Sequence, residues 1–122
     1  GLSTPEVFRR RDEMGEWAEL TRPDEQTLAA LTASAREAAP YLHNDLAAAA
    51  FTLRPELADT IEIGRESGAL AVILSGSGPT VAALVADERA ADSVAAAWRE
   101  ADQVDRVITT RGPAHGSVAS AN

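Results

Sequence analysis

Two short apolar runs separated by a glycine-rich hexapeptide constrain the fold of this 122-residue chain more than any other feature. The runs, residues 69–74 and 81–86, are rich in valine, isoleucine, leucine and alanine and are bounded by glycine, proline and charged residues. Such runs are typical of buried strands. Between them lies Ser75-Gly76-Ser77-Gly78-Pro79-Thr80. The sequence therefore predicts two neighbouring strands joined by a short loop.

Helices are predicted on both sides of these strands. Thr4-Pro5-Glu6 is a typical helix start, because threonine can cap, proline suits the first turn and glutamate complements the helix dipole. We expect helices over residues 5–14, 24–33, 44–53, 55–67 and 87–101, with Asp87 capping the last. Trp17 is expected to pack in the loop after the first helix.

Two of these helices carry apolar faces that should pack on the sheet. In residues 55–67 the apolar positions are Leu57, Ala58, Ile61 and Gly64, and the opposite, solvated face carries Asp59, Glu62 and Glu66. In residues 87–101 the apolar positions are Ala91, Val94, Ala95 and Trp98. This spacing places Trp98 in the core.

A final strand is predicted over residues 104–110, which makes the fold class α+β. The order of helices, strand, strand, helix and strand matches a ferredoxin-like plan whose first strand would lie before Gly1. We expect an antiparallel sheet packed by helices, one domain over residues 1–111 and a small polar tail over residues 112–122.

Composition narrows the range of partners. The net charge is −8 and the pI is near 4.6, which argues against nucleic acid and membrane surfaces as partners. All eleven basic residues are arginine, so the chain has no lysine to offer a phosphate. The absence of cysteine fits a reducing, cytoplasmic location.

The glycine-rich loop is the one segment with a chemical signature. Gly76 and Gly78 can adopt positive φ and let backbone amides converge on an anion, while Ser75, Ser77 and Thr80 offer hydroxyl donors. The same residues would also make an ordinary hairpin connection. The loop lacks the lysine of a Walker motif, and a strand follows it where a dinucleotide fingerprint has a helix. The residues alone leave both readings open.

Residues 68–84 resemble the third signature motif of the GHMP kinase superfamily, which includes galactokinase, homoserine kinase and mevalonate kinase. Within that superfamily the chain is most similar to the C-terminal domain of the kinases that act on diphosphocytidyl-methylerythritol in non-mevalonate isoprenoid synthesis. Residues 1–8, Asn44-Asp45-Leu46 and the glycine-rich loop carry that narrower resemblance. Ala47 departs from it, because the family often has glutamate there.

The resemblance implies an ATP-dependent kinase with Mg²⁺ as the usual partner of ATP. The glycine-rich loop would lie beside the phosphates, with the amides of Ser77 and Gly78 holding anionic oxygens and Ser75 and Thr80 orienting them. The family's main phosphate loop and its catalytic aspartate and lysine belong to an N-terminal domain. We therefore expect no catalytic residue in this chain, and no activity or bound cofactor when it is alone.

Other candidate residues have simpler explanations. His43 and His115 lack a metal-ligand pattern. Arg9-Arg10-Arg11 is followed by two acidic residues, which favours a solvated helix face over a phosphate clamp. Asn44-Asp45 most simply caps the following helix, with substrate contact as the alternative.

Two rival functions stay open. One is a stand-alone, ACT-like module that binds a small molecule, although ACT domains place their glycine between a strand and a helix. The other is a different GHMP kinase, such as homoserine kinase. A bare sheet edge also makes a homodimer an expectation to be tested.

Overall fold

The computed structural model describes residues 1–15 and 19–119 and has an α+β architecture. The helices are α1 (Thr4–Met14), α2 (Glu25–Ala33), α3 (Ala35–Ala38), the 3₁₀ turn η1 (Ala39–Tyr41), α4 (Ala47–Leu53), α5 (Glu56–Glu66) and α6 (Glu88–Glu100). The strands are β1 (Ala71–Leu74) and β2 (Val81–Leu84). The predicted packing of Trp17 lies outside the described residues.

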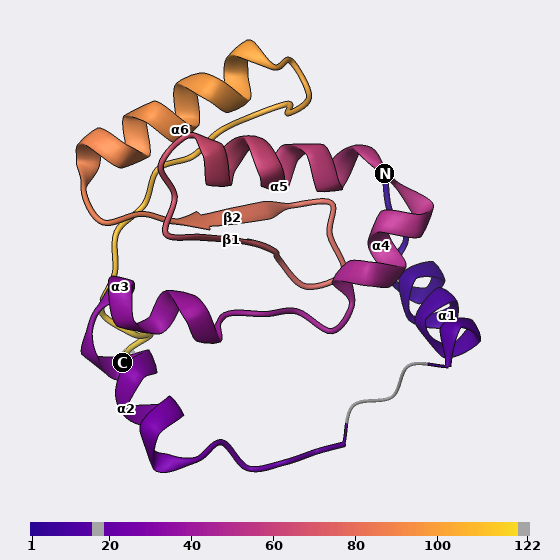
Figure 1. Ribbon diagram of the computed structural model, residues 1–122, viewed down its shortest axis with the longest axis horizontal. Helices are drawn as coiled ribbons and strands as arrows, with labels where there is room; N and C mark the ends of the chain where they lie inside the picture. The colour runs from indigo at the N-terminus through magenta and orange to yellow at the C-terminus, as the bar shows by residue number, and fades with distance from the viewer. Residues whose placement is uncertain (16–18, 120–122) are drawn as a thin grey trace.

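The two strands form an antiparallel sheet in which Ala71 faces Leu84 and Leu74 faces Val81. Helix α5 packs against both strands and against α6, and α1 packs against α4 (Figure 1). The glycine-rich loop leaves β1 at the end of the sheet nearest α4. The two strands and their connecting loop are thus confirmed.

Two apolar clusters hold these elements together. The first contains Val7, Ala49, Ala50, Leu57 and Leu74, and it joins α1, α4, α5 and the end of β1. The second contains Ile61, Val72, Val94 and Trp98, and it joins α5, β1 and α6. The first cluster therefore lies directly beneath the glycine-rich loop.

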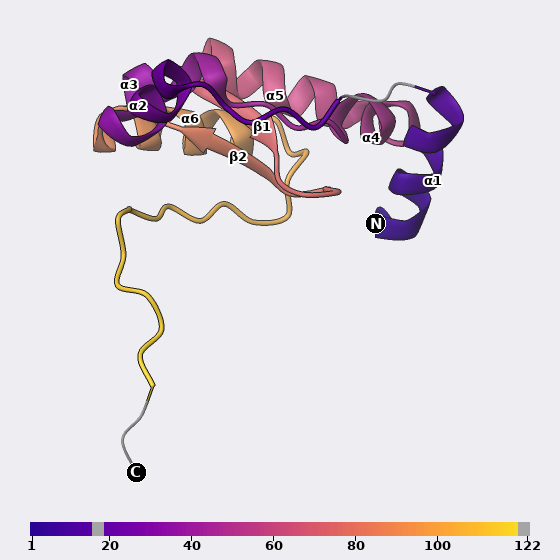
Figure 2. The ribbon, with the colours of Figure 1, turned by 90° about the horizontal axis from the view of Figure 1, so that it is seen from below.

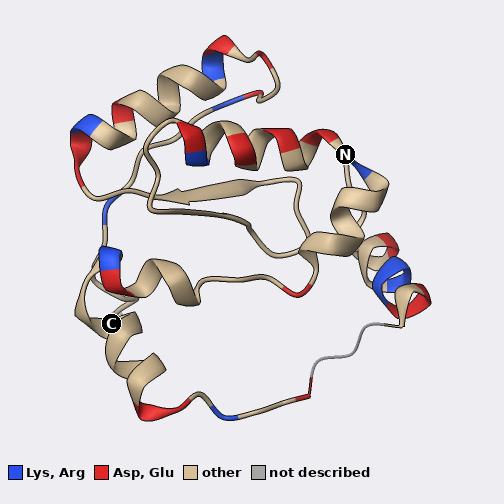
Figure 3. Cartoon of the chain, viewed as in Figure 1, with Lys and Arg blue, Asp and Glu red and all other residues tan. Residues whose placement is uncertain are grey.

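Several local signals act as expected. The Asp87 carboxylate accepts a hydrogen bond from the Ala90 amide at 2.8 Å, which caps α6. The Asp24 carboxylate does the same for α2, and this bond from the Thr27 amide lowers the pKa of Asp24. Acidic positions recur along α5, and blue arginine positions gather on α1 (Figure 3).

Two helix predictions need correction. Helix α4 begins at Ala47 rather than at residue 44, because the Asn44 side chain is engaged in contacts outside the helix. In α5 the buried position between Leu57 and Ile61 is Thr60, whereas Ala58 is exposed. Thr60 is tolerated there because its hydroxyl donates to the Glu56 carbonyl at 3.2 Å.

The strand predicted over residues 104–110 is wrong. This segment is irregular and packs against the second cluster through Val104 and Val107, and no strand in the described part of the chain is hydrogen-bonded to it. A strand requires a hydrogen-bonded neighbour, so the apolar pattern alone was insufficient. The chain after α6 passes β2 and then leaves the body, with residues 112–119 exposed (Figure 2).

No helix within residues 1–15 and 19–119 has the length and apolar character that a membrane span requires.

Candidate functional site

The glycine-rich loop closes as a tight turn. The Ser75 amide donates to the Thr80 carbonyl at 2.8 Å, and the Gly78 amide donates to the Ser75 carbonyl at 3.0 Å. Gly76 has φ +58°, while Ser77 has negative φ. Positive φ at only the first central residue is the pattern of a type II′ turn, for which glycine is the preferred residue.

Glycine is also required at position 78. Its φ is +80°, and a Cβ atom there would lie 2.8 Å from Cδ1 of Leu74 and 3.3 Å from Cδ1 of Leu2. Leu74 is 1% exposed, so it has little room to move away. The loop therefore rests directly on the first apolar cluster.

The turn determines which of the loop's amides are left unpaired. The Gly78 amide, expected to hold an anion, is consumed inside the turn. Within residues 1–15 and 19–119, no hydrogen-bond partner is present for the amides of Gly76 and Ser77 or for the hydroxyls of Ser75 and Thr80. Two amides and two exposed hydroxyls are thus available to bind a ligand, whereas the Gly78 amide stabilises the turn.

The Ser77 hydroxyl lies 2.8 Å from the hydroxyl of Thr4, 73 residues earlier in the sequence. This contact joins the loop to the first turn of α1, where Leu2 also approaches Gly78. The sequence indicated Thr4 only as a helix start. The distant pairing could not be read from it.

Asn44 makes contacts that sequence reasoning missed. Its Nδ2 donates to the carbonyl of Leu74 at 2.8 Å and to the carbonyl of Gly76 at 2.7 Å, and its Oδ1 accepts from the Leu46 amide at 2.9 Å. The expected helix cap is therefore wrong for Asn44, since α4 has no side-chain cap. The only signal was an asparagine before a helix, which also fits capping.

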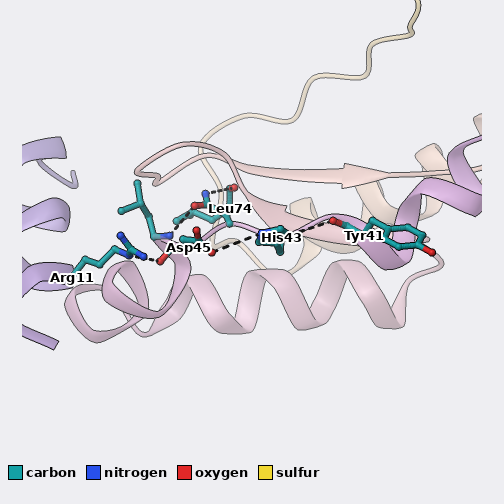
Figure 4. A network of polar contacts seen from close by, with 7 residues as sticks. Arg11, Tyr41, His43, Asp45 and Leu74 are labelled. Atoms are coloured by element: carbon teal, nitrogen blue, oxygen red, sulfur yellow. Dashed lines mark hydrogen bonds and ion pairs between the residues drawn. The ribbon is translucent and has the colours of Figure 1, made fainter. Parts of the chain in front are cut away.

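The arginine run is less solvated than predicted. The Arg11 Nε donates to the carbonyl of Asp45 at 3.1 Å, and the Arg10 Nε donates to the Thr52 hydroxyl at 3.0 Å, so α1 is tied to α4 and to the turn before it. Figure 4 shows the network that runs from Arg11 through Asp45 toward Leu74. These arginines brace the turn and the helix beside the loop.

The remaining candidates contribute nothing to the loop. His43 is exposed, and its Nε2 lies 3.8 Å from the Asp45 carboxylate. His115 lies in the exposed segment after α6. Asp59, Glu62 and Glu66 face solvent, as predicted. Among the described residues, no cluster of three or more histidine, aspartate or glutamate side chains could hold a metal ion.

A groove of about 440 Å³ opens beside the start of β2. Its walls are Arg54, Glu56, Leu57 and Thr60 around the start of α5, residues 79–81, Trp98 and residues 103–108. Arg54 and Glu56 form an ion pair at 3.0 Å on its rim, and the Glu56 amide together with Arg54 lowers the pKa of the Glu56 carboxyl. The groove thus separates β2 from the segment that was expected to be a strand.

Comparison with known proteins gives a consistent result. A family model described as GHMP kinases C terminal matches residues 24–103. A protein from Cutibacterium acnes named 4-diphosphocytidyl-2-C-methyl-D-erythritol kinase is 48% identical over 96% of this chain and 38% of its own length. Proteins of the same name from Corynebacterium glutamicum and Streptomyces coelicolor are each 45% identical, over 93% and 96% of this chain and 36% and 40% of their own lengths. The chain therefore spans well under half the length of these relatives.

Proposed function

The chain belongs to the GHMP kinase C-terminal family, and from that premise we propose that it serves as the C-terminal part of an ATP-dependent kinase. The proposed substrate is 4-diphosphocytidyl-2-C-methyl-D-erythritol, which the relatives carry in their names. The observation that carries this proposal is the similarity over at least 93% of the chain to relatives that share one name. A cytoplasmic location is part of the proposal.

In the proposed reaction a hydroxyl oxygen of the substrate forms a bond to the γ-phosphorus of ATP. The bond from that phosphorus to the bridging oxygen breaks, ADP leaves, and the hydroxyl proton passes to a base outside this chain. The glycine-rich loop would assist by binding anionic oxygens through the amides of Gly76 and Ser77, with the hydroxyls of Ser75 and Thr80 orienting them. Gly78 shapes this cradle.

The chain alone should be inactive. Phosphoryl transfer depends on positioning the phosphates and stabilising their charge, and this chain has no lysine. Among the described residues, no group of three or more histidine, aspartate or glutamate side chains is placed to hold a metal ion. We therefore propose that ATP and the remainder of the kinase hold Mg²⁺, and that the catalytic residues lie in that remainder.

The test is a product assay on the complete kinase that contains this chain. We expect ADP and a phosphorylated diphosphocytidyl-methylerythritol in equal amounts, and none from the 122-residue chain alone. Homoserine should not be phosphorylated. Phosphorylation of homoserine alone would support the rival kinase, and binding of a small molecule without ATP turnover would support the ACT-like module.

Gly78→Ala tests the proposed role of the loop in the same assay. The added Cβ would meet Leu74 and strain a positive φ, so we expect kcat/KM for ATP to fall roughly 10- to 100-fold through misplaced donors. Gly116→Ala is the control, because a Cβ at Gly116 meets nothing within 4 Å. Equal activity of the two variants would refute the proposal that the loop binds the phosphates.

We also propose that the fold is completed to a ferredoxin-like plan by a strand lying in the groove beside β2. Thr80 pairs with Ser75, so the alternation of an antiparallel ladder turns the N–H groups of Val81 and Ala83 toward the edge away from β1. Val81 lines the groove, and Val107 lines it from the segment after α6. An unpaired strand edge that faces an open groove favours an added strand.

Amide hydrogen exchange tests this completion. In the complete kinase the amides of Val81 and Ala83 should exchange at least 10-fold more slowly than in the 122-residue chain, because they would gain hydrogen-bond partners. Ala82 is the control, since its amide already faces β1. Equal rates for Val81 in both proteins would refute the added strand, and protection that grows with the concentration of the isolated chain would instead indicate the homodimer.

A further inference from the structure

Asn44 uses nearly all of its hydrogen-bonding capacity on backbone groups around the glycine-rich loop. Both Nδ2 donations go to carbonyls, at 2.8 Å to Leu74 and 2.7 Å to Gly76, while Oδ1 accepts from Leu46. An asparagine amide has two N–H donors and one carbonyl acceptor. Asn44 therefore bridges the turn before α4 to the loop that follows β1.

The carbonyls that Asn44 binds are ones that the sheet leaves unpaired. The pairing of Ser75 with Thr80 turns the Leu74 carbonyl toward the outer edge of β1, where the described residues place no further strand. The Gly76 carbonyl lies in the turn itself, and Gly76 has positive φ. Without Asn44 both carbonyls would depend on water.

The Gly76 carbonyl and the Ser77 amide belong to the same peptide unit. Because that unit is planar and trans, the direction of the carbonyl sets the opposite direction of the N–H. Holding the Gly76 carbonyl therefore aims the Ser77 amide, which is one of the loop's two amides that have no partner in the described chain. A glycine neighbour otherwise permits this peptide unit to rotate easily.

Asn44 is itself held in place from a second direction. The carbonyl of the next residue, Asp45, accepts a hydrogen bond from Arg11 of α1 at 3.1 Å. The Leu46 amide fixes Oδ1 of Asn44. Helix α1 and the turn before α4 thus help to set where the side-chain amide lies; Figure 4 shows the contact of Arg11 with Asp45.

We propose that Asn44 is a positioning residue for phosphate binding, which aims the Ser77 amide at an anionic oxygen by holding the Gly76 carbonyl. This inference rests on the proposed kinase function and deepens it. Asn44 is not a catalytic residue, because it acts through the loop and not on the reacting atoms.

Asn44→Asp tests this in the complete kinase, since the carboxylate keeps the acceptor for Leu46 and loses the donor to the two carbonyls. We expect KM for ATP to rise about 10- to 100-fold, with a smaller effect on KM for the second substrate, because only the loop's donors are misaimed. Asp59→Asn is the control, because it makes the reverse change on a solvent-facing residue of α5, away from the loop. Its kinetic constants should stay within about twofold of the unchanged kinase.

Nuclear magnetic resonance gives a readout that a purely structural role would not move. The Ser77 amide signal should shift on titration with ATP in the unchanged kinase and should shift far less in Asn44→Asp. Asn44→Ala, which introduces no repulsion, should reproduce this loss if Asn44→Asp fails to fold. If neither variant folds, a Ser77 signal that does not move at saturating ATP in the unchanged kinase overturns the proposal.

The two proposals fail in different ways. A complete kinase without ATP-dependent activity would refute the proposed function. An active kinase in which Asn44→Asp behaves like Asp59→Asn would refute the positioning role and leave the function intact.

Discussion

Leu74→Ala is expected to lower the free energy of unfolding by about 3–5 kcal/mol, the range found when a fully buried leucine is truncated and the cavity persists. Leu74 is 1% exposed and belongs to the cluster that joins α1, α4, α5 and the end of β1. Neighbours on several elements cannot all collapse into the vacated space. Urea unfolding of the 122-residue chain, followed by circular dichroism, measures the change.

Leu31→Ala is the control for this prediction. Leu31 lies on α2 and is 40% exposed, so its truncation should cost about 1 kcal/mol or less. If Leu74→Ala cost no more than Leu31→Ala, the first cluster would not be close-packed. The glycine-rich loop would then lack the rigid base on which Gly78 rests.

The parts of the fold that the sequence predicted well depend on local signals. The paired strands were marked by β-branched apolar runs with glycine and charge at their ends, and α6 was marked by the Asp87 cap and a helical apolar stripe. These features act within a few residues of one another, so no knowledge of the tertiary structure was needed.

The errors arose where the outcome depends on distant neighbours. Residues 104–110 have a strand-like pattern, yet the groove keeps them apart from β2. Thr60, and not Ala58, is buried because α5 is rotated to meet Trp98 and Gln103, to which the backbone and side chain of Thr60 hydrogen-bond. The periodicity of apolar residues does not reveal such tertiary partners.

The candidate site likewise has features that local sequence indicates and features that depend on distant residues. The hydroxyl and glycine composition of the loop was enough to suggest an anion cradle, but it could not tell which amides the turn would consume. That depends on the bond from Gly78 to Ser75. The supports from Thr4 and Asn44 span 73 and about 30 residues, and a polar residue near a helix start predicts a cap equally well.

Trp98→Ala is expected to lower the free energy of unfolding by about 3–5 kcal/mol. Trp98 is 8% exposed, its Nε1 donates to the Thr60 carbonyl at 2.8 Å, and a Cβ at Gly64 would lie 3.1 Å from its ring. The ring therefore fills the space that Gly64 leaves between α5 and α6. Its removal would open a cavity and free the Thr60 carbonyl together.

Trp98→Phe separates these two contributions. Phenylalanine keeps most of the apolar contact and loses the N–H donor, so the loss should be about 1–2 kcal/mol. Urea unfolding followed by circular dichroism compares the variants without relying on tryptophan emission. Equal losses for alanine and phenylalanine would mean that the hydrogen bond to Thr60, rather than the packing of the ring, holds α6 against α5.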